Sequence, residues 1–127
     1  GGLSLNNALH SGPSLLPRIF NVLLRFRQGR WAVLGDLAKA FLQIRLNPED
    51  RDVTRFLWEG REFRSTSVLF GATSSPALLQ TVLDYHLQEL GEREEWPKKI
   101  ISQIRQDLCV DDLTSSLDTE EEAALYW

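Results

Sequence analysis

Leu108-Cys109-Val110-Asp111-Asp112-Leu113 is the stretch of this sequence that decides the fold. Two adjacent carboxylates stand between short runs of β-prone residues, a pattern typical of the tip of a tight β-hairpin. A third carboxylate, Asp36, ends the apolar run that begins at Trp31, and this run is predicted to be a short buried strand. Acids at the ends of strands that are far apart in sequence can hold two divalent metal ions, so the pattern indicates metal-assisted phosphoryl chemistry.

Length and composition narrow the class of protein. A chain of 127 residues is one domain or a piece of one, and its 43% apolar and 25% charged residues are ordinary for a globular protein. No apolar run approaches the roughly 18 residues of a membrane helix, and Gly1–His10 is too polar for a signal peptide. The single Cys109 excludes an internal disulfide, and the lack of a Cys/His cluster argues against structural zinc. The lack of Met and the end at Trp127 indicate an excerpt from a longer polypeptide.

Charge is unevenly distributed along the chain. The net charge of -4 argues against a free-standing nucleic-acid-binding protein, which usually has a basic face. Basic residues nevertheless gather in the first third of the sequence, at Arg18, Arg25, Arg27, Arg30 and Arg45. Acids gather later, at Glu89, Glu92, Glu94, Glu95 and from Asp118 to Glu122.

Hydrophobic periodicity and turn residues predict an α+β chain with helices packed on an antiparallel sheet. Residues 1–12 lack periodicity and are predicted to be an extended loop. A helix is expected from Ser14, as its cap, to Gly29, where it ends. The remaining expected elements are a strand over 31–36, a short helix over 38–42, strands over 54–58 and 62–69, a helix capped by Ser74 or Ser75, a charged connector over 91–97, a helix over 98–105, the acidic hairpin over 107–116 and a last helix capped by Asp118 or Thr119.

Three segments resemble the palm motifs of reverse transcriptases, and they follow one another in the same order and with the same spacing as those motifs. They are Asp36-Leu-Ala-Lys-Ala-Phe41, Val68-Leu-Phe-Gly71 leading to Ser75-Pro76, and Cys109-Val110-Asp111-Asp112. The details are most similar to the Pao or BEL branch of LTR retrotransposons. The segments that carry this finer resemblance are Gly2–Asn6, Gly12–Pro17, Arg25-Phe26-Arg27, Glu49–Asp52 and Arg55–Trp58.

The resemblance implies a fold and a place in a larger protein. It implies a polymerase palm with an antiparallel sheet and packed helices, part of the fingers, and no thumb. Residues 1–127 would be a partial reverse transcriptase domain, the end of the fingers and most of the palm. The parent polyprotein would also contain an aspartic protease, an RNase H and an integrase, and reverse transcription would occur in cytoplasmic particles with no membrane partner. The excerpt alone is expected to have little or no activity.

The resemblance also implies the chemistry. Asp36, Asp111 and Asp112 would be the catalytic residues and the ligands of two Mg²⁺ or Mn²⁺ ions, with Asp36 and Asp111 bridging and Asp112 supporting. Two-metal transfer joins a dNTP to the 3′-hydroxyl of a primer paired with an RNA or DNA template. Side chains alternate along a strand, so adjacent Asp111 and Asp112 need not both be direct ligands.

Further residues are assigned by the same resemblance. Leu37, Phe41, Phe70 and Gly71 would bind the nucleotide, with Phe41 crowding a ribose 2′-hydroxyl and Gly71 allowing close approach of the backbone. A core phenylalanine is the alternative interpretation of Phe41. Ser75 and Pro76 would start a supporting helix.

Cys109 and Val110 would lie beside the primer terminus. Cys109 stands where the family nearly always has an aromatic residue, so primer placement would be weakened. The remaining polar candidates, Lys39, Arg45, His10 and His86, are interpreted as surface or structural residues.

Two alternative functions stay open at this point. One is a catalytically inactive remnant of a retrotransposon polymerase, which Cys109 favours and the three intact aspartates disfavour. The other is an unrelated metal- or nucleotide-binding module. The residues from Asp111 to Ser115 do not continue into the oxygen-rich loop of a calcium site, which argues against it.

Overall fold

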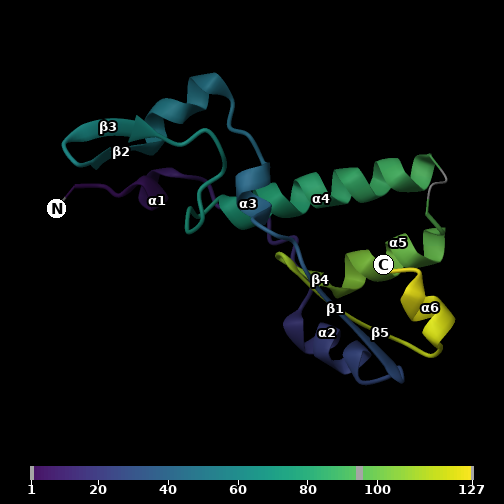
Figure 1. The fold of residues 1–127 in the computed structure, drawn as a ribbon. Coiled ribbons are helices and arrows are strands. Elements are labelled where there is room, and N and C mark those ends of the chain that lie inside the picture. Colours follow the sequence, from purple (N-terminus) through teal and green to yellow (C-terminus); the bar gives the residue numbers. More distant parts are fainter. Residues whose placement is uncertain (1, 94–95, 127) are drawn as a thin grey trace. The chain divides into compact units, whose positions relative to one another are not determined.

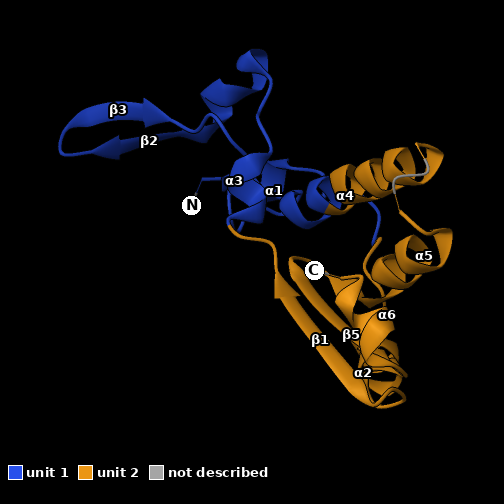
Figure 2. Ribbon diagram, turned by 45° about the vertical axis from the view of Figure 1, so that its right-hand side comes forward, with its two compact units in different colours: residues 1–14, 39–79 blue, residues 15–38, 80–127 orange. Residues whose placement is uncertain are grey.

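The computed structural model describes residues 2–93 and 96–126, which form two compact units (Figures 1 and 2). Unit 1 comprises residues 1–14 and 39–79, and unit 2 comprises residues 15–38 and 80–127. The three predicted catalytic aspartates and Leu37 belong to unit 2, whereas Phe41, Phe70 and Gly71 belong to unit 1.

Unit 2 is built on a three-stranded antiparallel sheet in the order β1-β5-β4. Strand β1 spans Trp31–Asp36, β4 spans Leu108–Cys109 and β5 spans Asp112–Leu117. The register of β1 and β5 runs from Trp31 opposite Leu117 to Asp36 opposite Asp112. The predicted strand over 31–36 and the acidic hairpin are both present in the structure.

Helices complete unit 2 beside this sheet. They are α2 (Ile19–Phe26), α5 (Lys98–Asp107), α6 (Glu120–Ala124) and the larger part of α4 (Ser75–Glu92). Both α2 and α5 contact the central strand β5. The apolar core of the unit consists of Val22, Val33, Leu87, Ile100, Ile101, Leu108 and Leu117.

Unit 1 contains a two-stranded hairpin, two short helices and a 3₁₀ helix. Strands β2 (Arg55–Trp58) and β3 (Arg61–Arg64) pair antiparallel, and the rings of Phe56 and Phe63 stack with centroids 5.8 Å apart. The helical elements are α1 (Leu5–Ala8), α3 (Ala40–Gln43) and η1 (Pro48–Thr54). Ala40, Phe41, Val68 and Leu79 are its buried apolar residues.

The structure corrects two predictions at the beginning of the chain. Residues 1–12 are not all loop, because Ser4 and Asn7 form a reciprocal capping box on α1. The helix expected from Ser14 begins only at Ile19, and Arg18 at its N-cap makes no side-chain cap. Pro17 disfavours helical conformation at Leu16, which argues against a helix that begins at Ser14 or Leu15.

Other elements differ in extent or burial. Strand β3 ends at Arg64 rather than Leu69, and α4 continues through Gly91 to Glu92. In β1 only Val33 is buried, because β1 lies at the edge of the sheet, so the prediction of a buried strand was wrong in that respect. Two residues of the predicted connector, Glu94 and Glu95, lie outside the described residues, as do Gly1 and Trp127. Among the helices described, none is both long and apolar enough to cross a bilayer.

Candidate active site

Asp36 and Asp112 lie directly across from each other in the sheet. Asp36 is the last residue of β1, Asp112 is the first residue of β5, and their Cα atoms are register partners. Directly opposed residues of an antiparallel pair project from the same face, with Cβ atoms about 4.5–5.5 Å apart. Both side chains are exposed. The fold thus brings two of the three predicted acids together at one end of the sheet.

Cys109 extends this pair into a row across all three strands. It is the register partner of Asp112 on the opposite side, in β4, and its thiol is free and half-buried. Because paired residues share a face, Asp36, Asp112 and Cys109 project from one side of the sheet. We call these three residues the acidic row. The residue predicted to lie beside the primer is therefore adjacent to a predicted catalytic acid.

Asp111 is held in the turn that joins β4 to β5. Its carbonyl oxygen accepts a hydrogen bond of 2.9 Å from the backbone N–H of Leu37, the residue that follows Asp36. The register therefore places Asp112, rather than Asp111, directly opposite Asp36. The bridging role assigned to Asp111 stays a prediction, while its backbone ties the turn to the end of β1.

Val110 adopts a backbone conformation that is costly for its residue type. Its φ is +63°, and Asp111 is not among the residues with positive φ. In the turn from Cys109 to Asp112, a positive φ at the first central position alone corresponds to a type II′ turn, which favours glycine there. A β-branched residue in this region stores strain of about 1–3 kcal/mol, and such strain concentrates at functional sites.

The two carboxylates of the acidic row are suitable ligands for a hard divalent cation. Carboxylate oxygens are the donors that Mg²⁺ prefers, and it usually takes one or two of them together with water and phosphate oxygens. Asp36 and Asp112 meet that requirement as a pair. Within residues 2–93 and 96–126, however, no group of three or more Asp, Glu, His or Cys side chains is gathered closely enough to hold a metal ion. The described structure thus presents a pair of acids rather than a closed three-acid site.

The predicted nucleotide-binding residues of unit 1 also contact one another. Phe41 is in α3 with 8% of its surface exposed, and Phe70 packs edge-on against it with ring centroids 5.7 Å apart at 73°. Phe70 itself is 87% exposed. Phe41 is therefore a core residue of unit 1 that supports an exposed aromatic ring.

Gly71 has the conformation and the space that close approach of a ligand requires. Its φ is +84°, and a Cβ placed there would meet nothing within 4 Å. Asn6 fixes this turn from both sides: its Nδ2 donates to the Gly71 carbonyl at 3.0 Å, and its Oδ1 accepts from Thr73 N–H at 2.9 Å. Sequence reasoning did not assign this role to Asn6, since a single polar residue in a loop gives no signal of a partner 65 positions away.

The other polar candidates show local roles. Lys39 is exposed and has a left-handed φ of +55° before α3, and Arg45 donates to the Thr66 hydroxyl at 3.1 Å. His10 Nδ1 accepts from the Gly12 backbone N–H at 3.0 Å, and His86 is exposed.

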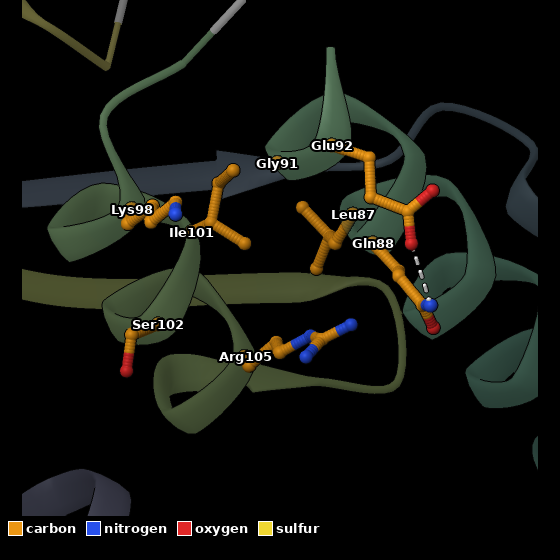
Figure 3. A pocket seen from close by; sticks show the side chains of 8 residues that line it. All are labelled: Leu87, Gln88, Gly91, Glu92, Lys98, Ile101, Ser102 and Arg105. Atoms are coloured by element: carbon orange, nitrogen blue, oxygen red, sulfur yellow. Dashed lines mark hydrogen bonds between the residues drawn. The ribbon is translucent and has the colours of Figure 1, made fainter. Parts of the chain in front are cut away.

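A separate pocket of about 410 Å³ lies between α4 and α5 (Figure 3). Figure 3 shows Leu87 and Ile101 facing each other across it, with Lys98 and Arg105 on the α5 side. Arg105 is already engaged, because its Nη2 donates to the Asp84 carbonyl at 2.9 Å. The lining includes none of the residues predicted from the sequence to form the active site.

Comparison with known proteins identifies the family to which these elements belong. Residues 5–126 match the family described as reverse transcriptase (RNA-dependent DNA polymerase). The chain belongs to the reverse transcriptase family. A curated relative, the enzymatic polyprotein of Cestrum yellow leaf curling virus, is 28% identical over 88 residues, which cover 68% of this chain and 14% of that protein.

Two solved structures share the fold of this reverse transcriptase chain. The foamy viral protease-reverse transcriptase in complex with an RNA/DNA hybrid has a TM-score of 0.60 and 19% identity, covering 84% of this chain and 13% of that one. The native prototype foamy virus protease-reverse transcriptase has a TM-score of 0.59 and 21% identity, covering 83% and 12%. The predicted α+β polymerase fold is confirmed, and the chain spans about one-eighth of these neighbours.

Proposed function

We propose that this chain is the palm, with part of the fingers, of an RNA-directed DNA polymerase that transfers dNTPs onto a primer 3′-hydroxyl. The observation that carries the proposal is the acidic row, in which Asp36 and Asp112 oppose each other beside Cys109. Family membership supplies the reaction class. The Pao or BEL type remains part of the proposal and rests on the sequence segments quoted above.

Asp36, Asp111 and Asp112 are the residues that would hold the divalent metal ions. When bound, two such ions activate the attacking hydroxyl and stabilise the leaving pyrophosphate. The contribution of the protein is to hold the carboxylates in place. The register of β1 with β5 fixes Asp36 against Asp112, and the Leu37–Asp111 hydrogen bond fixes the turn.

The residues of unit 1 would serve the incoming nucleotide. In this proposal Phe41 discriminates against ribose, and the exposed Phe70 and the open Gly71 turn contact the nucleotide. Leu37 keeps the nucleotide-binding role that the family resemblance implies. An RNA or DNA template with its primer is the proposed partner, in keeping with the RNA/DNA hybrid held by one foamy viral neighbour. The relative in Cestrum yellow leaf curling virus is an enzymatic polyprotein, which supports an origin in a polyprotein. The RNase H, integrase and aspartic protease of that polyprotein are part of the proposal and rest on the family resemblance.

Primer extension by a polymerase that contains this segment tests the proposal. Asp36→Asn and Asp112→Asn keep side-chain size and remove the charge, so we expect each to lower kcat by roughly a thousandfold. Asp118→Asn is the matched control, because Asp118 is an exposed acid outside the acidic row. Retention of the wild-type rate by both row variants would refute the assignment.

A catalytically inactive remnant is the second candidate, and Cys109 is the observation that favours it. A half-buried thiol stands in the acidic row where the family nearly always has an aromatic residue. A wild-type polymerase that binds primer-template but extends no primer with either Mg²⁺ or Mn²⁺ would support this candidate.

A further inference from the structure

One buried carboxylate of unit 2 has no part in the chemistry proposed above. Asp107 is the last residue of α5, only 1% exposed, and it immediately precedes β4. A buried charge is costly unless it is paired and hydrogen-bonded, so the Asp107 carboxylate requires specific partners around it.

Both oxygens of this carboxylate are occupied by donors from other elements. Arg25 of α2 donates through Nε to Oδ1 at 2.8 Å, and the hydroxyl of Ser115 in β5 donates to Oδ2 at 2.7 Å. Ser115 is fully buried. Arg25 also donates through Nη2 to the carbonyl oxygen of Gln106. We call Arg25, Asp107 and Ser115 the buried triad, after its buried carboxylate and hydroxyl; the Arg25 side chain is 30% exposed.

Hydrogen bonds between side chains and backbone groups connect the triad to the next residue of β5. The Ser116 hydroxyl donates to the Arg25 carbonyl at 2.9 Å and accepts from the Gly29 N–H at 3.1 Å. The side-chain amide of Gln103 in α5 donates to the Ser116 carbonyl at 3.3 Å. The C-terminal end of α2, the end of α5 and the middle of β5 are thereby held in one hydrogen-bonded arrangement.

The triad lies at the base of the hairpin whose tip holds the predicted catalytic residues. Asp107 precedes β4, which has only two residues, and Ser115 follows Asp112 by three positions in β5. Strand β4 pairs with β5 at only two positions, so few ladder hydrogen bonds support the turn in holding the register, and a slip of one residue would send every side chain to the other face. Directional hydrogen bonds at both strands fix the register in a way that apolar contacts, which lack direction, do not.

We infer that Asp107, held by Arg25 and Ser115, is a positioning residue that fixes β5 against β4 and against the end of α2, which leads into β1, and so keeps Asp112 opposite Asp36. The inference rests on the proposed polymerase function for its catalytic consequence. The register itself is a structural property that can be measured without activity.

The first test is steady-state primer extension by a polymerase that contains this segment. The variants are Asp107→Asn, which removes the charge at constant size, Arg25→Met, and the two combined. Assays are run at a temperature where circular dichroism shows each variant folded. Lys99→Met is the matched control, because it breaks the exposed 2.6 Å Lys99–Glu122 ion pair of the same unit.

We expect a kcat effect that depends on the metal ion. Misplacement of reacting groups by about 1 Å can cost up to roughly a hundredfold, so each triad variant should lower kcat at least about tenfold. The Mg²⁺ concentration for half-maximal rate should rise, and KM for dNTP should stay within about twofold, because the nucleotide-binding residues of unit 1 are untouched and only the backbone of Leu37 is affected. A kcat and Mg²⁺ dependence equal to those of wild type, in folded triad variants, would overturn the inference.

The second test is hydrogen exchange at the Leu37 amide, which donates to the Asp111 carbonyl. In Asp107→Asn we expect exchange at Leu37 to accelerate at least about tenfold while the β2–β3 hairpin is unaffected, since only the local opening equilibrium changes. Unchanged protection of Leu37 would overturn the inference even if the enzyme is inactive. An inactive wild type with the expected exchange result would instead count against the proposed function alone. Ser115→Ala replaces Asp107→Asn if the latter does not fold.

Discussion

Gly29 offers a stability test of the contact between the α2–β1 turn and the strand that carries Asp112. A Cβ at this position would lie 2.5 Å from the Leu117 backbone N, 2.6 Å from the Leu117 carbonyl O and 2.7 Å from the Ser116 carbonyl C. Ordinary van der Waals contact begins near 3.4 Å, so the difference of 0.9 Å (3.4 minus 2.5) must be absorbed by movement. The obstructing atoms belong to backbone, which cannot rotate away as a flexible side chain would.

The magnitude follows from the place of these atoms in the sheet. Ser116 and Leu117 of β5 pair with Ala32 and Trp31 of β1, so shifting this part of the β5 backbone disturbs its pairing with β1. Overpacking of a well-packed site typically costs 1–3 kcal/mol. For Gly29→Ala we expect the upper end of this range, so the free energy of unfolding should fall by about 3 kcal/mol. This loss is a large part of the 5–15 kcal/mol by which a typical domain is stable.

Urea unfolding monitored by circular dichroism measures this loss, with Gly35→Ala as the control. A Cβ at Gly35 in β1 would meet the Leu113 Cβ at 3.7 Å, which is an ordinary contact. Gly35→Ala should leave the free energy of unfolding unchanged or raise it by up to about 1 kcal/mol, because it lowers the entropy of the unfolded chain. The reasoning is refuted if the two variants differ by less than about 0.5 kcal/mol, the scale of an ordinary surface substitution.

Three further predictions concern single residues. Hydrogen bonds from Arg55 and Arg64 hold the pKa of the Asp52 carboxyl below its ordinary 3.8. The stabilisation from these pairs is therefore present above pH 3.8 and is lost as the pH falls through the folded-state pKa of Asp52. NMR titration of the Asp52 carboxyl should show that its pKa rises in Arg55→Met. In an active polymerase, Phe41→Ala should raise ribonucleotide incorporation roughly ten- to hundredfold, and unchanged incorporation in primer extension would refute the sugar-discriminating role. Cys109→Tyr should raise the rate of primer extension by restoring aromatic packing beside Asp112, and no gain would remove the reason for regarding Cys109 as a defect.

The sequence predicts the ends of the strands in unit 2 but not how they pair. Asp36 and the Asp111-Asp112 hairpin are recognisable because apolar runs stop at carboxylates. The choice of Asp112 as the partner of Asp36 depends on the β1–β5 register, which is set by contacts between segments more than 70 residues apart. Local propensity carries no information about such a register. The bridging role of Asp111 rests on the family resemblance and stays a prediction.

The buried triad could not be predicted for a related reason. In the sequence, Asp107 is an ordinary acid near the end of a helix, and such a residue is normally solvated. Its burial depends on Arg25, 82 positions earlier, and on Ser115 in the following strand. A polar network of this kind becomes visible only when the fold brings its members together.

Together, these contacts indicate that strand β5 sets the geometry of the proposed active site. The hairpin itself contributes a two-residue β4 and a turn strained at Val110. Its support comes from outside: the Leu37 amide at the tip, the buried triad at the base, and Gly29 against the far end of β5. Because the last two contacts involve residues distant from Asp112, substitutions there should alter catalysis without touching substrate, whereas substitutions in unit 1 should act on nucleotide selection.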